Sequence, residues 1–342
     1  MELPEDLSRL LLPWYRENRR DLPWRETRDP YRVWLSEIML QQTRVEAVKG
    51  YYTRFLEALP DIRTLADCPE DRLMKLWEGL GYYSRARNLQ KAARMILSAY
   101  GGTFPRDPEQ VLALPGVGNY TAGAICSICF DLPIPAVDGN VLRVCSRVLA
   151  SREDIALPET KAAVRDALSR RFPPIGRGDF NQALMELGAT VCIPKGEPSC
   201  SACPLREICL SRERQLWREL PVRSPKKARV REDVTVFLLL CGEKTALRKR
   251  PEGGLLSGLW EFPSLSGRLS AQQALDRAED WGCRPLSLLE VKKREHVFTH
   301  REWRMTGYVI RCDAMPERFE WAGEAELDGA YPLPSAFRKF RT

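Results

Sequence analysis

Long apolar runs are scarce in this sequence. The longest, Val234 to Cys241, is interrupted by Thr235 and is far shorter than the roughly 18 residues that a membrane-spanning helix needs. The first residues, Met1 to Asp6, lack the basic-then-apolar order of a secretion signal. Internal repeats and low-complexity tracts are also missing from the sequence. We therefore expect no membrane association and a location in the reducing cytosol.

The composition is close to that of an ordinary globular protein. Hydrophobic residues make up 44% and charged residues 29%, near the usual values of about 45–50% and about 25%, which argues against disordered and fibrous classes. The 342 residues suit two domains at about 150 residues each. A net charge of +7 is consistent with a polyanionic partner.

Residues 216–232 read as a basic linker between two domains. The stretch contains two prolines, Pro221 and Pro225, and between Val222 and Arg231 it has no acidic residue and five basic ones: Arg223, Lys226, Lys227, Arg229 and Arg231. This composition predicts an extended segment that can lie along phosphates, with a solvated tether as the alternative.

The two sides of this linker have different periodicities. Up to about residue 215, apolar residues recur at helical spacing, and Pro30, Pro69 and Pro108 stand where helices would begin. From about residue 233, the runs Val234–Leu240 and Trp303–Arg311 are typical of strands, with glycines between them. We predict a helical first domain and an α+β second domain.

Four cysteines form the strongest local pattern. Cys192, Cys200, Cys203 and Cys209 follow the spacing C-x7-C-x2-C-x5-C. In a reducing compartment such a group more often binds a metal than forms disulfides. The spacing leaves zinc and iron–sulfur open, because both accept four thiolates. The other seven cysteines are scattered and are expected to behave as small buried apolar residues.

A glycine-containing hairpin, Leu114-Pro115-Gly116-Val117-Gly118, separates two helical runs. Its glycines allow a tight turn and a close approach to another surface, and the helix expected from Asn119 would present free backbone N–H groups to an anion such as phosphate. Taken alone, an ordinary Pro-Gly turn is the competing interpretation.

Two carboxyl groups stand in contexts that suit chemistry. Glu37 lies on a largely apolar helical face, where it is either a surface charge or an acid whose proton is held by desolvation. Asp138 precedes an apolar helical stripe, where it is an N-cap and can also remain ionised beside the positive end of the helix.

These features together resemble a known family. The matching segments are Leu22–Arg25, Trp34–Gln42, Gly79–Tyr83, Leu114–Tyr120, Val137–Asn140, Phe180–Gly188 and the four cysteines. In this order they resemble the helix-hairpin-helix DNA glycosylases with an iron–sulfur cluster, and most closely the MutY family. The resemblance implies a mainly α helix-hairpin-helix glycosylase domain at 1–215 with a 4Fe-4S loop at 192–209. The linker at 216–232 would be followed by an α+β MutT/Nudix-like domain at 233–342.

The resemblance assigns catalytic roles. Glu37 matches the general acid that protonates adenine, and Asp138 matches the carboxylate that stabilises positive charge on the sugar. Tyr120 and Asn140 match residues that line the same pocket. Bifunctional relatives carry a lysine nucleophile where this chain has Tyr120, so a Schiff base cannot form there and a monofunctional glycosylase is expected.

Further residues match positions that bind DNA or the cluster. The target base must leave the duplex before it can react. The resemblance implies base and wedge contacts from Trp24, Arg25, Gln42, Tyr82 and Gln182, phosphate contacts from Gly116, Gly118 and Lys195, and a 4Fe-4S cluster on Cys192, Cys200, Cys203 and Cys209. The cluster would be structural and electrostatic.

The sequence also departs from the family pattern. The first two cluster cysteines are separated by one residue more than usual. The segment Ala271–Asp280 lacks the acidic box with which MutT-like hydrolases bind magnesium, so nucleotide hydrolysis is not expected. Instead, Phe298-Thr299-His300 matches a Phe-Ser-His loop that recognises 8-oxoguanine. The threonine adds a methyl group, which predicts altered lesion discrimination.

The expected function is therefore excision of adenine mispaired with 8-oxoguanine or guanine in double-stranded DNA, by a monomer in the cytoplasm at the nucleoid. Three alternatives remain: a glycosylase for another mismatch, a bifunctional endonuclease III-like lyase, and a non-enzymatic DNA-binding module with a structural metal.

Overall fold

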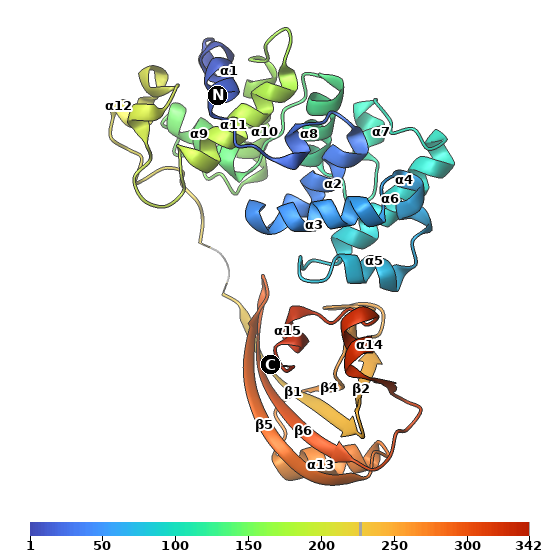
Figure 1. The fold of residues 1–342 in the computed structure, drawn as a ribbon. Helices are drawn as coiled ribbons and strands as arrows, with labels where there is room; N and C mark the ends of the chain where they lie inside the picture. The colour runs from blue at the N-terminus through green and yellow to red at the C-terminus, as the bar shows by residue number, and fades with distance from the viewer. Residues whose placement is uncertain (226–227, 342) are drawn as a thin grey trace. The chain divides into compact units, whose positions relative to one another are not determined.

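The computed structural model describes residues 1–225 and 228–341, which fall into two compact units (Figure 1). The first unit comprises residues 1–67 and 87–225, and the second comprises residues 68–86 and the described residues after Pro225. Lys226 and Lys227 of the predicted basic linker lie outside the described residues.

The first unit is helical. Its helices are α1 (Leu7–Asn18), η1 (Pro23–Arg25), α2 (Pro30–Leu40), α3 (Val45–Ala58), α4 (Ile62–Asp67), the greater part of α6 (Ser84–Tyr100), α7 (Pro108–Leu112), α8 (Asn119–Phe130), α9 (Gly139–Val148), α10 (Pro158–Ser169), α11 (Arg177–Thr190), η2 (Cys200–Ala202), η3 (Arg206–Ile208) and α12 (Leu210–Glu213). Helix α5 (Glu70–Leu76) and the start of α6 belong to the second unit.

Proline marks helix starts as the sequence predicts. Pro30 and Pro108 are the first residues of α2 and α7, and in each case the preceding aspartate caps the helix by accepting backbone N–H bonds. Pro69 differs slightly, because it is the N-cap of α5 and so lies one position before the first helical residue.

The core of the first unit fixes the elements that carry the candidate site. Helices α1, α9, α10 and α11 pack around a cluster that includes Leu11, Val144 and Phe180. Almost every residue of α2 is buried, and the contacts of α8 with both α2 and α11 join this helix to the same region. Side chains from α2, α8, α9 and α11 can therefore meet inside the unit.

The predicted hairpin connects α7 to α8, with α8 beginning at Asn119 as expected. Gly116 has a φ of 78°, and a Cβ atom there would lie 2.7 Å from the Cβ of Asn88. Both the left-handed backbone and this close approach require glycine. The helix-hairpin-helix element of the predicted fold class is thus confirmed.

The second unit contains a mixed seven-stranded sheet in its described residues. Its strands are β1 (Val230–Cys241), β2 (Lys244–Lys249), β3 (Trp260–Glu261), β4 (Ser264–Ser266), β5 (Pro285–Val297), β6 (Arg301–Cys312) and β7 (Glu320–Ala322). The order is β3-β2-β1-β6-β5, with β4 on β1 and β7 on β2. Strands β1 and β6 are parallel, and the other pairs are antiparallel.

Both faces of this sheet are covered, which explains the continuous apolar run in β1. Val236 and Leu238 pack in one cluster with Phe337 of α15 (Ser335–Arg338) and with Leu327 of α14 (Glu324–Gly329). Phe237 packs in the other cluster, against α13 (Ala271–Asp280). Strands buried on both faces lose the alternation of apolar and polar residues. The predicted α+β class of this domain is confirmed.

Among the described residues, no helix is long and apolar enough to span a bilayer.

Candidate active site

Glu37 lies in the buried helix α2, and its residue is only 6% exposed. The Tyr120 hydroxyl donates a hydrogen bond of 2.7 Å to Oε2 of this carboxyl group. Burial raises the pKa of Glu37 to about 7, the nearby charge of Asp138 acts in the same direction, and the Tyr120 hydrogen bond and the charge of Arg25 oppose the rise. Glu37 is thus a buried acid, as one of the two sequence interpretations required.

Tyr120 stands in the first turn of α8, directly after the hairpin. Its hydroxyl group contacts Met185 Sδ at 3.3 Å as well as the Glu37 carboxyl group. Burial raises the pKa of Tyr120 well above its usual value, and the neighbouring carboxyl groups of Glu37 and Asp138 add to the rise. The phenol therefore keeps its proton and acts as a fixed donor.

Asp138 is the N-cap of α9. It accepts a 2.8 Å bond from the Val141 backbone N–H and a 2.7 Å bond from the Asn140 side-chain amide. Burial raises the pKa of Asp138, whereas these donors and the charge of Arg143 favour the carboxylate. Asp138 also acts electrostatically on Glu37, so the structure places both predicted carboxyl groups in one site.

Arg143 connects this site to the start of the cysteine loop. Its guanidinium group donates bonds of 2.8 Å to Asn140 Oδ1, 2.6 Å to the Gly188 carbonyl oxygen and 2.7 Å to the Cys192 carbonyl oxygen. Gly188 makes the approach possible, because a Cβ atom there would lie 2.5 Å from the Cβ of Asn140. Helices α9 and α11 are thereby held closely together beside Asp138.

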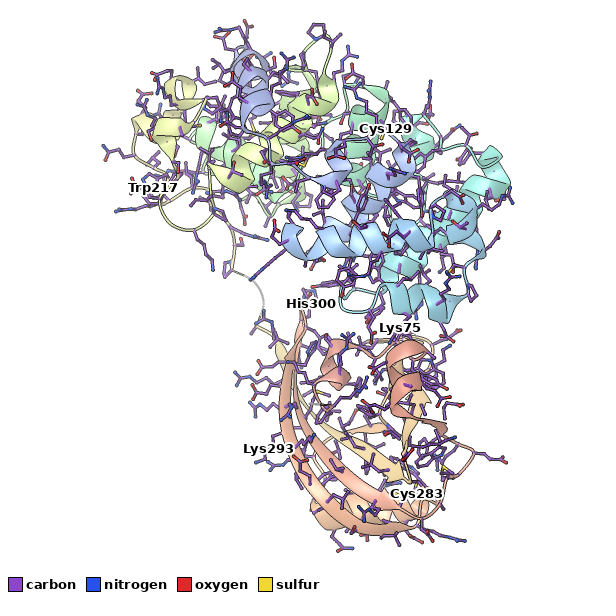
Figure 2. The ribbon with its side chains drawn as sticks, viewed as in Figure 1. Lys75, Cys129, Trp217, Cys283, Lys293 and His300 are labelled. Carbon is purple, nitrogen blue, oxygen red and sulfur yellow. The ribbon has the colours of Figure 1, made fainter. Side chains whose placement is uncertain are left out.

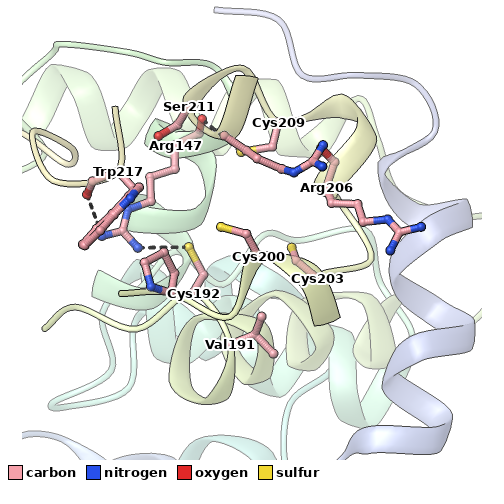
Figure 3. A pocket seen from close by; sticks show the side chains of 11 residues that line it. Arg147, Val191, Cys192, Cys200, Cys203, Arg206, Cys209, Ser211 and Trp217 are labelled. Carbon is pink, nitrogen blue, oxygen red and sulfur yellow. Dashed lines mark hydrogen bonds between the residues drawn. The ribbon is translucent and has the colours of Figure 1, made fainter. Parts of the chain in front are cut away.

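The four predicted metal ligands line one pocket together with Arg147, which donates a 3.3 Å bond to Cys192 Sγ (Figure 3). Within the part of the chain that the structure describes, no three His, Cys, Asp or Glu residues converge on a single-ion site. Four cysteines that line one pocket supply the four thiolates that an iron–sulfur cluster takes. Of the other seven cysteines, five are buried and two are half-buried.

Comparisons with known proteins match two family models to the chain. Residues 35–174 match the family model described as "HhH-GPD superfamily base excision DNA repair protein", and residues 235–342 match the model of the NUDIX domain. The mouse adenine DNA glycosylase is 37% identical over 90% of this chain and 70% of its own length, and the human one is 37% identical over 97% and 72%. The chain belongs to the adenine DNA glycosylase family.

Solved structures agree with this assignment for the helical part of the glycosylase. A thermostable thymine-DNA glycosylase matches with a TM-score of 0.56 and 31% identity, over 60% of this chain and 95% of its own. An endonuclease III in a non-covalent DNA complex matches with a TM-score of 0.53 and 25% identity, over 63% and 99%. The chain is thus a DNA N-glycosylase, as the sequence resemblance implied.

The predicted base contacts in this glycosylase lie in different surroundings. Arg25 and Gln182 line one pocket. Trp24 is instead buried, with its ring edge-on to Tyr52 at a centroid distance of 5.5 Å. Trp24 thus has a packing contact, and the base contacts expected from Trp24, Arg25 and Gln182 stay predictions.

The two predicted wedge residues share an unusual backbone. Gln42 and Tyr82 are both exposed and have positive φ angles of 59° and 47°. A non-glycine residue adopts this left-handed conformation at an energetic cost, and residues held in it are concentrated at functional sites. Within the second unit, the Tyr82 hydroxyl group and Thr299 Oγ1 form a 2.6 Å hydrogen bond.

The predicted phosphate contacts are accessible. Gly116 and Gly118 are exposed at the N-terminus of α8, and Lys195 is exposed in the loop between Cys192 and Cys200. Accessible backbone N–H groups at a helix N-terminus suit phosphate binding.

The predicted 8-oxoguanine loop is the turn between β5 and β6. Phe298 packs edge-on against Trp303 at 4.9 Å, which fixes the base of the turn. Thr299 and His300 are both exposed, and Figure 2 shows His300 at the tip of the turn. His300 is therefore accessible to a partner, Thr299 is exposed but bonded to Tyr82, and Phe298 anchors both.

Sequence reasoning assigned no role to Arg143 or Glu186, although both support the site. Arg143 lies three residues after Asn140, so both occupy one face of α9. Glu186 follows Gln182 by four residues on α11 and accepts bonds from Arg20 and Arg25. The sequence signal that could have identified them is their spacing of three or four residues from predicted site residues on the same helix.

Proposed function

We propose that this glycosylase removes adenine mispaired with 8-oxoguanine or guanine from double-stranded DNA, and that it hydrolyses the glycosidic bond without cutting the strand. The observation that carries the proposal is the buried Glu37 carboxyl group, whose pKa is about 7 and which shares a site with Asp138. The names of the relatives that match most of this chain support adenine as the substrate.

Glu37 supplies the proton. A carboxyl group with a pKa near the working pH is present in its acid form and still releases its proton readily. Protonation of a ring nitrogen turns the flipped adenine into a better leaving group. The Tyr120 hydroxyl group, which donates to Oε2, orients the carboxyl group and leaves the other oxygen for the base.

Asp138 stabilises the sugar. As the bond to the base breaks, positive charge develops on the deoxyribose, and a fixed carboxylate lowers the energy of that state. The donors from Asn140 and Val141 hold the Asp138 carboxylate in place. The base leaves with the proton from Glu37, and water then adds to the cationic sugar and returns one proton to the Glu37 carboxylate.

The chemistry at position 120 supports monofunctional cleavage. A lyase of the endonuclease III kind needs an amine that forms a Schiff base with the sugar. Here the position holds a phenol that is engaged with Glu37. Borohydride reduction during turnover should therefore trap no covalent DNA adduct.

Cys192, Cys200, Cys203 and Cys209 would hold a 4Fe-4S cluster in the pocket that they line. When bound, the cluster would cross-link the loop that carries Lys195, with no redox step in base excision. Brown absorbance with bound iron and sulfide would support this assignment, and stoichiometric zinc would contradict it.

The decisive experiment uses duplexes that carry adenine opposite 8-oxoguanine, guanine or cytosine, followed by alkali. We expect strand breaks at adenine opposite 8-oxoguanine and guanine, and few opposite cytosine. Thymine or guanine opposite mismatched bases serve as alternative substrates. Cleavage confined to one of those, or no cleavage at adenine, would overturn the proposal.

A further inference from the structure

A buried ion-pair cluster stands beside the candidate active site. Glu186 of α11 is fully buried, and its carboxylate accepts bonds from the Arg20 backbone N–H at 2.9 Å, from Arg20 Nε and Nη2 at 2.8 Å each, and from Arg25 Nη2 at 2.7 Å. Burial would raise the pKa of Glu186, but the hydrogen bonds from the two arginines outweigh it and bring the pKa to about 2.

The ion-pair cluster of Glu186, Arg20 and Arg25 also fixes the orientation of the Arg25 side chain. The side chain of Arg25 is only 10% exposed. One of its terminal nitrogens donates to the Arg20 carbonyl oxygen at 3.0 Å, the other is bound to Glu186, and the guanidinium group lies over the Tyr15 ring at 5.6 Å. The guanidinium group is therefore held by three separate partners.

The positive charge of Arg25 acts to lower the pKa of the Glu37 carboxyl group. The charged or titratable groups that act on Glu37 are Tyr120, Asp138 and Arg25, and Arg25 is the cation among them. An unneutralised guanidinium group at this place favours the ionised form of Glu37. Ionised Glu37 has no proton to give to the base, so the charge of Arg25 works against the acid step.

We propose that Glu186 is a positioning residue that holds Arg25 at the base pocket while neutralising its charge, so that Arg25 can contact adenine without ionising Glu37. The inference rests on the proposed function, because it assumes that Glu37 must be protonated for base excision. The carboxylate of Glu186 lies one helical turn from Gln182 on α11, so one helix face supplies both a base contact and the counter-charge.

The test is the pH profile of single-turnover excision by the whole protein. Glu186→Gln removes the counter-charge and retains the shape of the side chain. Arg20 and Arg25 then carry two uncompensated charges, and the pH above which activity falls should move down by about one unit. Activity at pH 8.5 should fall about tenfold relative to wild type, whereas activity at pH 5.5 should stay within about threefold.

A second change separates charge from packing. In the double variant Glu186→Gln with Arg25→Gln, the Arg25 charge that acts on Glu37 is gone together with its counter-charge. The upper pH limit should therefore return to the wild-type value or exceed it, while base contact stays weakened. Arg25→Gln alone should move the limit upward. The shift of the upper pH limit in Arg25→Gln remains measurable if Glu186→Gln alone proves too unstable to assay. The matched control is Glu219→Gln, whose partner Arg152 lies in an exposed ion pair.

The outcomes are distinguishable. Wild-type protein that excises no adenine refutes the proposed function. Wild-type protein that excises adenine, with Glu186→Gln slower by the same factor at every pH, refutes the charge role of Glu186. An unchanged upper limit in Arg25→Gln refutes it as well, and a downward shift in Glu186→Gln that the double variant reverses supports it.

Discussion

The candidate catalytic site and the candidate lesion-recognition turn of this glycosylase are built in opposite ways. In the first unit, the buried Glu37 and the half-buried Tyr120 and Asp138 come from three helices and share one site. In the second unit, Thr299 and His300 stand exposed at the tip of one turn. Desolvation is what raises the pKa of Glu37, whereas an exposed turn can contact a base without perturbing its own chemistry. Chemistry and recognition thus make different demands on burial.

The largest expected effect is on the acid step. Glu37→Gln keeps the side-chain size but removes the proton that the base needs, so single-turnover excision of adenine should fall by about 10²–10⁴. Binding to the mismatched duplex should stay close to wild type. The control is Glu46→Gln, which changes an exposed carboxylate paired with Lys49. Excision within threefold of wild type would show that Glu37 is not the acid.

The burial of Glu37 should also lower the free energy of unfolding of the protein at high pH. The pKa of Glu37 is raised from 4.5 to about 7, so its contribution is fully present below pH 4.5 and is lost as pH rises through 7. The total is about 3 kcal/mol. Glu37→Gln should therefore be more stable than wild type at pH 8 and similar at pH 4.5, as measured by urea unfolding. Equal unfolding free energies at pH 8 would contradict the buried-acid assignment.

Much of the secondary structure and one residue of the candidate site could be predicted from the sequence. These features depend on residues that are close together in the chain. Proline and aspartate mark the starts of α2 and α7, and the N-cap role of Asp138 follows from the apolar stripe behind it. The run Val234–Leu240 indicates the strand β1. Each of these features depends on residues only a few positions apart.

The supporting network could not be predicted in the same way. Arg20 and Glu186 are 166 positions apart in the chain, and Arg143 reaches three elements whose approach depends on the absence of a side chain at Gly188. The packing of Trp24 against Tyr52 likewise joins residues 28 positions apart. Such partners are set by tertiary packing, to which helical spacing gives only an indirect clue.

A smaller effect is expected at the cysteine pocket. Cys200→Ser removes one of four thiolates, and because metal binding contributes to folding, the protein should lose its brown absorbance and about 2 kcal/mol of stability, or about 5 °C in Tm. The control is Cys129→Ser, which changes a half-buried cysteine outside this pocket. Unchanged iron content in Cys200→Ser would remove this residue from the ligand set.

The smallest effect is expected at the exposed turn, where it tests whether recognition is separable from chemistry. Each good base contact contributes about 1–3 kcal/mol, and the low end suits a solvent-exposed side chain. His300→Ala should reduce the preference for adenine opposite 8-oxoguanine over adenine opposite guanine by about fivefold, with the rate opposite guanine unchanged. Thr299→Ser keeps the hydroxyl group and removes only the methyl group, so the preference should change by less than twofold or increase. If His300→Ala slowed excision equally on both duplexes, the turn would serve catalysis or folding, and the division between a buried chemical site and an exposed reading site would be wrong.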